Sequence, residues 1–227
     1  MDWLEIASKK PIYLNLGGGS FCHPMAGYEN YISVDEKPHS GSGWVVKHDL
    51  TKPVPLPDNS VDRILAEDCL EHLKIEDIKY VLAEAFRLLK PGGIMRIGVP
   101  DYNNPKDHPY LEKGSDIRYP QHSTLTHYSL MLEIIRESLF SRYRFYHYWD
   151  QGQFIQHKID YGLGMVRRTP DNCPDNRRWG LLGKIKGLVR DILYLFSSGA
   201  RFSLQGLSVQ RGHHLYTTSL VVDLFKD

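Results

Sequence analysis

The sequence is poor in cysteine and has no long apolar run. Its 227 residues include 3 cysteines, at Cys22, Cys69 and Cys173, whose spacing fits no metal-ligand motif. So few cysteines, and an odd number, are typical of thiols that stay reduced, so we expect a cytoplasmic location and predict no metal site. No apolar stretch approaches the roughly 18 residues of a membrane span. The first residues also lack the apolar core of a signal peptide.

The chain also lacks an excess of charge of either sign. It has 28 Lys and Arg against 27 Asp and Glu, for a formal net charge of +1. No overall field therefore favours nucleic acid, and we expect a small-molecule partner instead. Hydrophobic residues make up 41% of the chain, which is enough for a core in a single domain over residues 1–227.

What the chain does contain is a strand-like run that ends in glycines. Residues 12–21 read IYLNLGGGSF. A buried parallel strand that gives way to glycines opens its backbone to a ligand, because glycine has no Cβ and accepts positive φ. We predict that Gly17, Gly18 and Gly19 form the floor of a binding site. The alternative is a tight structural turn.

Strand-like and helix-like segments alternate through the first half of the chain. The clearest helix is 75–89, where apolar residues recur every three or four positions and a Pro-Gly-Gly stop follows. Strands are predicted at 12–16, 31–34, 44–46, 61–66 and 94–99. This alternation predicts an α/β fold of three layers around a doubly wound, mostly parallel, Rossmann-like sheet.

The second half is predicted to complete that sheet with an antiparallel edge hairpin. A helix at 125–140 precedes a strand at 143–149, which we expect to pair with a closing strand at 215–225. The loop 101–124 is long for a compact domain and is predicted to be a lid on the acceptor side. Residues 150–214 are predicted to be an insertion that also lines the acceptor pocket.

One stretch of this insertion, Leu181–Phe196, is amphipathic. It suits packing over the acceptor site or against a second subunit in a homodimer. Weak contact with a membrane surface is the alternative. Arginine pairs at 167–168 and 177–178 suit either solvent or an acidic group of a ligand.

Acidic residues stand at the ends of further predicted strands. Asp35 lies 18 positions after Gly17, close to the roughly 20 residues at which an acid reaches a ribose diol. Asp49 and Leu50 follow the third strand, and Glu67 ends the fourth. Because parallel strands present their carboxyl ends at one edge of the sheet, these residues predict a nucleoside site.

The residues after the glycines distinguish between nucleoside ligands. A pyrophosphate prefers a helix N-terminus directly after the glycines, but Pro24 and Gly27 interrupt any such helix. S-adenosylmethionine has no phosphate and needs only close backbone approach, so it is the predicted cofactor. An NAD(P)-linked oxidoreductase is the less favoured alternative.

The chain resembles the class I S-adenosylmethionine-dependent methyltransferases. The runs LNLGGGS, SVDE, HDL, LPDNSVDRILAEDCLEHL and EAFRLLKPGGIMRIGVPD carry the resemblance, which is strongest over residues 11–101. It is similar in particular to a small bacterial group associated with polysaccharide biosynthesis clusters, which implies a glycan-type or small acceptor and a sugar oxygen as the methylated atom. The resemblance implies these cofactor contacts: the methionyl part at Gly17 and Gly19, the ribose at Asp35, the adenine at Asp49 and Leu50, and the methionine end at Glu67.

Methyl transfer from a sulfonium depends mainly on alignment, and it needs a base only where the acceptor loses a proton. Asp101 follows the fifth strand, close to the expected position of an acceptor. His122 precedes the helix at 125–140, where the related group often has a histidine. Both are predicted as catalytic residues.

Asn15 and Phe21 depart from the pattern of the resembled family. They leave open a non-catalytic, cofactor-binding homologue that acts as a partner subunit. Asp68, Glu71 and His72 are interpreted as capping and orienting the helix that follows them.

Overall fold

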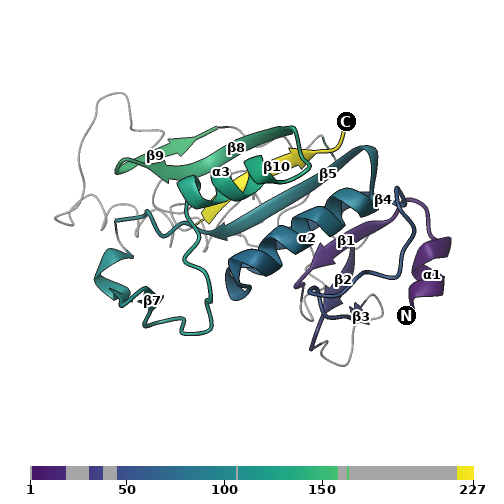
Figure 1. The fold of residues 1–227 in the computed structure, drawn as a ribbon, viewed down its shortest axis with the longest axis horizontal. Coiled ribbons are helices and arrows are strands. Elements are labelled where there is room, and N and C mark those ends of the chain that lie inside the picture. Colours follow the sequence, from purple (N-terminus) through teal and green to yellow (C-terminus); the bar gives the residue numbers. More distant parts are fainter. Residues whose placement is uncertain (1, 19–30, 38–44, 106, 158–162, 164–218) are drawn as a thin grey trace, which may run out of the picture.

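The computed structural model describes residues 2–18, 31–37, 45–105, 107–157, 163 and 219–227. In this part of the chain, strands form one large twisted sheet with helices packed against it (Figure 1). Its helices are α1 (Trp3–Ser8), α2 (Ile75–Leu88) and α3 (Tyr128–Glu137). The strands of the large sheet are β1 (Tyr13–Leu16), β2 (Tyr31–Asp35), β3 (Val45–Lys47), β4 (Val61–Glu67), β5 (Leu89–Pro100), β8 (Arg142–Asp150), β9 (Gln153–Gln156) and β10 (Ser219–Phe225).

The strand order is that of a doubly wound sheet. The described strands lie in the order β3-β2-β1-β4-β5-β10-β8-β9. Strands β1 to β5 run parallel, whereas β10 is antiparallel to both β5 and β8. The predicted α/β fold with an antiparallel edge is confirmed, as is the pairing of strand 143–149 with the closing strand. The order reverses between β1 and β4, and ligands bind at such a switch point.

The apolar core lies between the sheet and its helices. Leu82 of α2, Ile134 of α3 and Ile64 of β4 are among its buried members. Because side chains alternate along a strand, Leu65 belongs to the opposite face, where it joins a second apolar cluster. Leu163 packs against that cluster. Both faces of the sheet are therefore apolar, as in other parallel sheets.

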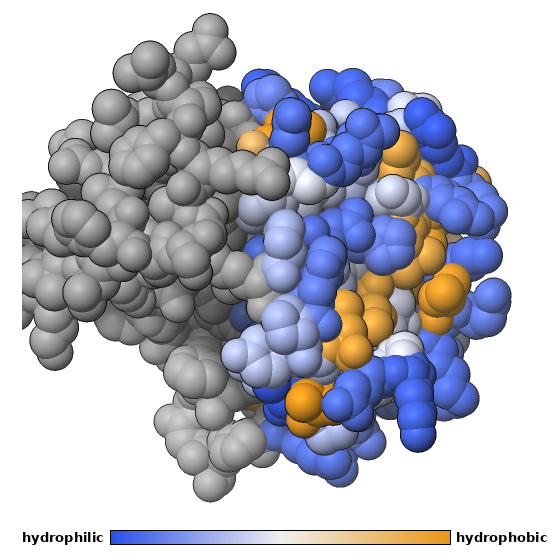
Figure 2. Space-filling model, turned by 90° about the vertical axis from the view of Figure 1, so that its left-hand side faces the viewer, coloured by the Kyte–Doolittle hydropathy of each residue, from blue (hydrophilic) through white to orange (hydrophobic). Residues whose placement is uncertain are grey.

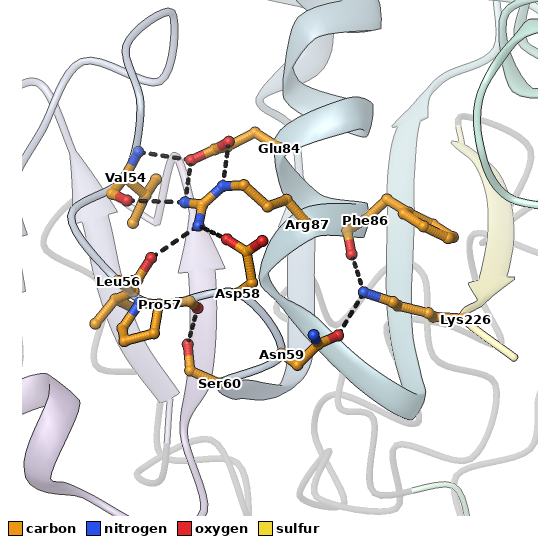
Figure 3. A network of polar contacts seen from close by, with 10 residues as sticks. All are labelled: Val54, Leu56, Pro57, Asp58, Asn59, Ser60, Glu84, Phe86, Arg87 and Lys226. Carbon is orange, nitrogen blue, oxygen red and sulfur yellow. Dashed lines mark hydrogen bonds and ion pairs between the residues drawn. The ribbon is translucent and has the colours of Figure 1, made fainter.

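Arg87 ties α2 to the proline-rich segment before β4 (Figure 3). Its guanidinium donates to the carbonyl oxygens of Val54 and Leu56, at 3.0 and 2.9 Å. It also pairs with the carboxylates of Glu84 and Asp58, each at 2.6 Å. The prolines of this segment reduce its own supply of backbone donors, so the side chain of Arg87 supplies donors instead.

Some elements differ from the sequence prediction. Helix α3 begins at Tyr128 rather than at residue 125, because His127 is its N-cap and accepts from the N–H of Leu130 at 3.4 Å. Strand β9 lies at the start of the predicted insertion and was not predicted, because QFIQ is too short to carry a clear pattern. It extends the sheet beyond β8. The predicted loop 101–124 also contains a small hairpin of β6 (Leu111–Glu112) and β7 (Ser115–Asp116).

Several predictions fall outside the described residues. These are Gly19, the amphipathic stretch Leu181–Phe196, the arginine pairs at 167–168 and 177–178, and most of the insertion. A single domain over residues 1–227 also stays a prediction. Every helix in the described part of the chain is too short or too polar to span a lipid bilayer.

Candidate functional site

Several predicted cofactor residues stand where parallel strands end. Leu16, the last residue of β1, pairs with β2 on one side and with β4 on the other. Gly17, Asp35 and Glu67 therefore stand at the ends of three adjacent strands, which in a sheet lie about 4.8 Å apart. This arrangement was predicted from the spacing of the motifs.

The glycines of this edge are also required by the packing beneath them. Gly17 has a φ of +64°, and a Cβ there would lie 2.7 Å from Cβ of Cys69. A Cβ on Gly18 would meet the side chains of Asn15 and Ser33. Asn15, which departs from the pattern of the resembled family, thus packs directly under the glycine loop. Cofactor contact at these glycines stays a prediction.

Asp35 and Asp49 each stabilise a turn at the end of a strand. The Oδ1 atom of Asp35 accepts the N–H of Lys37 at 2.8 Å. The Oδ1 atom of Asp49 accepts the hydroxyl of Thr51 at 2.7 Å and its N–H at 2.9 Å. These bonds lower the pKa of Asp49, the hydroxyl more than the N–H. Asp49 thus caps a turn, and the contacts of Asp35 with ribose and of Asp49 and Leu50 with adenine stay predictions.

Glu67 is buried at the end of β4, with 1% of its surface exposed. Its side chain lies against Gly98 of β5, where an added Cβ would be 3.1 Å from Cγ of Glu67. Glu67 is therefore packed within the floor of the site. Its contact with the methionine end of a cofactor stays a prediction.

Asp101 anchors the segment that follows β5. Its side chain is fully buried. Its Oδ2 accepts the N–H of Trp149 at 2.6 Å, and its Oδ1 accepts that of Asn103 at 3.1 Å. Burial raises the pKa of Asp101 to about 6, although the two main-chain bonds oppose the rise. Because both oxygens face main chain, the geometry favours positioning of the loop over direct contact with an acceptor.

His122 lies within a cluster of aromatic rings. Its Nδ1 is 2.6 Å from the hydroxyl of Tyr102. The imidazole stacks on Tyr119, with ring centroids 5.1 Å apart, and meets the ring of His72 edge-on at 4.8 Å. Burial is the main cause that lowers the pKa of His122, and the nearby His72 lowers it further.

The segment that carries His122 is hydrogen-bonded to residues just before α2. The N–H of Thr124 donates to the carbonyl oxygen of Glu71 at 3.0 Å. The hydroxyl of Thr124 donates to the carbonyl oxygen of Leu73 at 2.6 Å. At the other end of the segment, the N–H of Tyr102 donates to the carbonyl oxygen of Thr126 at 2.9 Å. The predicted lid is thus held at both ends beside the edge of the sheet.

An open hollow of about 370 Å³ adjoins this segment. Lys74 and Ile75 at the start of α2 line one side, and Ser123 and Leu125 line another. Ser123 directly follows His122, so the hollow lies beside the aromatic cluster.

Sequence reasoning missed the role that Glu71 and His72 have in this cluster. Both lie in the 3₁₀ turn Leu70–His72, which follows β4. The helix that they were expected to cap has Lys74 as its N-cap, whose side chain makes no capping hydrogen bond. Instead, one potential ligand atom from each of Glu71, His72 and His122 lies within 4.8 Å of the others. The motif EHL alone could not reveal a partner so distant in the chain.

Residues 15–97 match the family model described as a methyltransferase domain. The chain contains a methyltransferase domain. The matched segment begins in β1 and ends in β5, so it includes Gly17, Asp35, Asp49 and Glu67. The match agrees with S-adenosylmethionine as the predicted methyl donor.

Solved structures of methyltransferases are similar to this chain to different degrees, and one has a TM-score above 0.5. An S-adenosylmethionine-dependent methyltransferase from Archaeoglobus fulgidus has a TM-score of 0.54 and 13% identity, over 98% of this chain and 89% of that chain. Phosphoethanolamine N-methyltransferase 2 from Haemonchus contortus, in complex with S-adenosyl-L-methionine, has a TM-score of 0.47 and 14% identity, over 97% and 50%. Geranyl diphosphate C-methyltransferase from Streptomyces coelicolor A3(2) has a TM-score of 0.47 and 11% identity, over 99% and 78%. A comparison with curated proteins gives no match.

Proposed function

We propose that this methyltransferase transfers a methyl group from S-adenosylmethionine to an oxygen atom of a small or glycan-type acceptor. The observation that carries the donor half is the adjacency of Gly17 and Asp35 at the ends of paired parallel strands. A ribose diol needs a carboxylate beside a backbone turn that a ligand can approach closely. The glycan character of the acceptor is supported by the resemblance to the polysaccharide-associated group.

The bound cofactor supplies a methyl group on a positively charged sulfur atom. In the proposed complex, Asp35 accepts hydrogen bonds from the ribose, Asp49 and Leu50 contact the adenine, and Glu67 lies near the methionine end. Because the displacement is direct, the main task of the chain is to align the acceptor oxygen with the methyl group.

The acceptor is proposed to lie on the side of the segment 101–124. The hollow beside Ser123 and the rings of Tyr102, Tyr119 and His122 support this placement. Figure 2 shows hydrophobic residues in a broken band bordered by hydrophilic ones, on the end of the molecule that carries β7 and β9. Such a mixed surface suits a ligand with both polar and apolar parts.

Isothermal titration with S-adenosylhomocysteine tests the donor site. We expect saturable binding by the chain, and Asp35→Ala should weaken it at least about 10-fold, since about 1.4 kcal/mol of ribose hydrogen bonding is lost. Glu36→Ala is the matched control, because Glu36 is the exposed neighbour of Asp35 and should leave the affinity unchanged. Folded protein that gives no heat at millimolar ligand would overturn the proposal.

A transfer assay with labelled cofactor and a panel of nucleotide sugars tests the acceptor class. Labelled sugar is the expected product. Cofactor that binds but stays intact over long incubation with every acceptor would instead support the non-catalytic homologue. Nicotinamide binding, seen by fluorescence, would support the oxidoreductase.

A further inference from the structure

We propose that Glu71, His72 and His122 together bind one divalent transition-metal ion, for which zinc is the best fit. One potential ligand atom from each residue lies within 4.8 Å of the others. Ligand atoms around tetrahedral zinc, with bonds of about 2.0–2.1 Å, lie roughly 3.3 Å apart. His72 is exposed, so small shifts that keep its ring orientation can bring the three ligand atoms closer together.

The ring of His72 is already held as a metal-binding imidazole would be. Its Nδ1 lies 3.2 Å from the carbonyl oxygen of Gln121. A carbonyl oxygen only accepts, so Nδ1 carries the proton and Nε2 keeps its lone pair. Metal-binding histidines usually donate their second N–H to such a partner, which fixes the tautomer and the orientation of the ring.

The ring of His122 has a comparable support. Tyr102 is hydrogen-bonded through its side chain to Asp116 and also lies 2.6 Å from Nδ1 of His122. Arg118 binds both oxygens of Asp116, at 3.0 and 2.7 Å, and keeps it a carboxylate. The phenol therefore donates to Asp116 and accepts from Nδ1 of His122, which leaves Nε2 for a metal.

The third member brings negative charge to the cluster. Glu71 is buried, with 1% of its surface exposed. A cation beside it would favour the buried carboxylate, since buried charges are usually paired or bound to metals. Two imidazoles and one carboxylate are also the protein ligands of many catalytic zinc sites, which keep a fourth position open for water or substrate.

The three residues lie where an open coordination position of the metal would face the proposed acceptor side. The turn Leu70–His72 directly follows β4, whose end carries Glu67, and His122 adjoins the hollow at Ser123. With metal bound, His122 serves as a ligand rather than as the base predicted from the sequence. Metal binding is independent of the proposed methyl transfer, because it requires neither cofactor nor acceptor.

The test is a zinc titration of tag-free protein that has first been stripped with a chelator. We expect calorimetry to show one zinc ion bound per chain. A cobalt-substituted sample should show the visible absorption of a cobalt ion with a low coordination number. The chain has 11 histidines, so variants are needed to locate the ion. His72→Ala and His122→Ala should each weaken binding about 100-fold or more. His108→Ala, an exposed histidine outside the cluster, is the control that should bind zinc unchanged.

A second set of variants separates metal binding from folding. Tyr102→Phe keeps the ring and removes the hydroxyl, so it should weaken zinc binding about 10- to 100-fold. Glu71 is buried, so its substitution is expected to affect folding as well as metal binding. The decisive variant is therefore that of the exposed His72, and circular dichroism checks that it folds. Unchanged zinc affinity in a folded double variant of His72 and His122 would overturn the proposal. So would the absence of zinc and cobalt binding by the unaltered chain.

Discussion

At the scale of single residues, two separate constraints require glycine at position 17: its backbone conformation and the space around it. Gly17 and Gly114 both have positive φ, at +64° and +80°, but only Gly17 has a neighbour, Cys69, where a Cβ would lie. Gly114→Ala should therefore cost only backbone strain, about 1–2 kcal/mol. Gly17→Ala should cost about 1–3 kcal/mol more, because it also overpacks the space against Cys69. Urea unfolding measures both, and equal losses would contradict the packing argument.

The buried carboxyl of Asp101 predicts an unusual dependence of stability on pH. Its pKa rises from 3.8 to about 6 on folding, so the native state holds this proton more tightly than the unfolded state. The stabilisation is complete below pH 3.8 and is lost as the pH rises through about 6. The whole loss is about 3 kcal/mol, for a shift of roughly two pH units.

Asp101→Asn removes the titrating carboxyl group. It also removes one of the two oxygen atoms that accept main-chain N–H groups. The variant should be less stable than the unaltered chain at pH 4.5. The gap should narrow toward pH 7.5, because only the unaltered chain loses stability by ionising Asp101. Denaturant unfolding across this range checks the slope. Parallel curves for the two proteins would mean that Asp101 is ionised throughout.

At the scale of elements, α2 depends on the contacts of Arg87. Arg87→Ala should lower the free energy of unfolding by about 2–4 kcal/mol, because several charge-assisted hydrogen bonds are lost together. Arg87→Lys should recover only part of this loss, since lysine keeps the charge without the planar fork of donors. Thermal and urea unfolding measure the difference.

Lys79 offers a matched control on the same helix. It pairs with Glu137 at 2.9 Å, with 38% of its side chain exposed. Lys79→Ala should change stability by less than about 1 kcal/mol, because solvent screens such pairs. A loss as large as that of Arg87→Ala would contradict the distinction between the two contacts.

The elements that the sequence predicted best have local, repeated patterns. The apolar period of 75–89 and the glycines after β1 are properties of neighbouring residues, so α2 and the end of β1 were found almost residue for residue. The start of α3 depends instead on His127, whose capping contact the apolar period does not reveal. Strand β9 forms by pairing with β8, and a segment of four residues is too short for its sequence to predict that pairing.

The same distinction applies to the candidate site. The order of Gly17, Asp35 and Glu67 along parallel strands followed from spacing alone. The cluster of Glu71, His72 and His122 did not, because it requires the segment after β5 to return to the end of β4. The buried position of Asp101 likewise depends on β8, which supplies Trp149.

At the scale of the whole molecule, a buried ion pair joins β5 to β10. Nε and Nη2 of Arg96 each donate to a separate carboxylate oxygen of Asp223 at 2.7 Å, and both side chains are fully buried. Arg96→Met or Asp223→Leu alone should cost about 3–5 kcal/mol, because each leaves a buried charge without its counterion. The double variant should cost much less than the sum of the two. A double-mutant cycle by urea unfolding measures the coupling, and additive losses would contradict it.

The position of β10 late in the chain has a consequence for folding during translation. Among the described strands, β8 reaches the rest of the sheet only through β10, which pairs with β5 from residues 219–225. A nascent chain that has already released β5 and β8 therefore cannot join them until this later strand emerges from the exit tunnel. Meanwhile the edge of β5 offers unpaired backbone groups to any neighbouring polypeptide. Translation speed over residues 157–218 thus sets how long that edge stays unpaired.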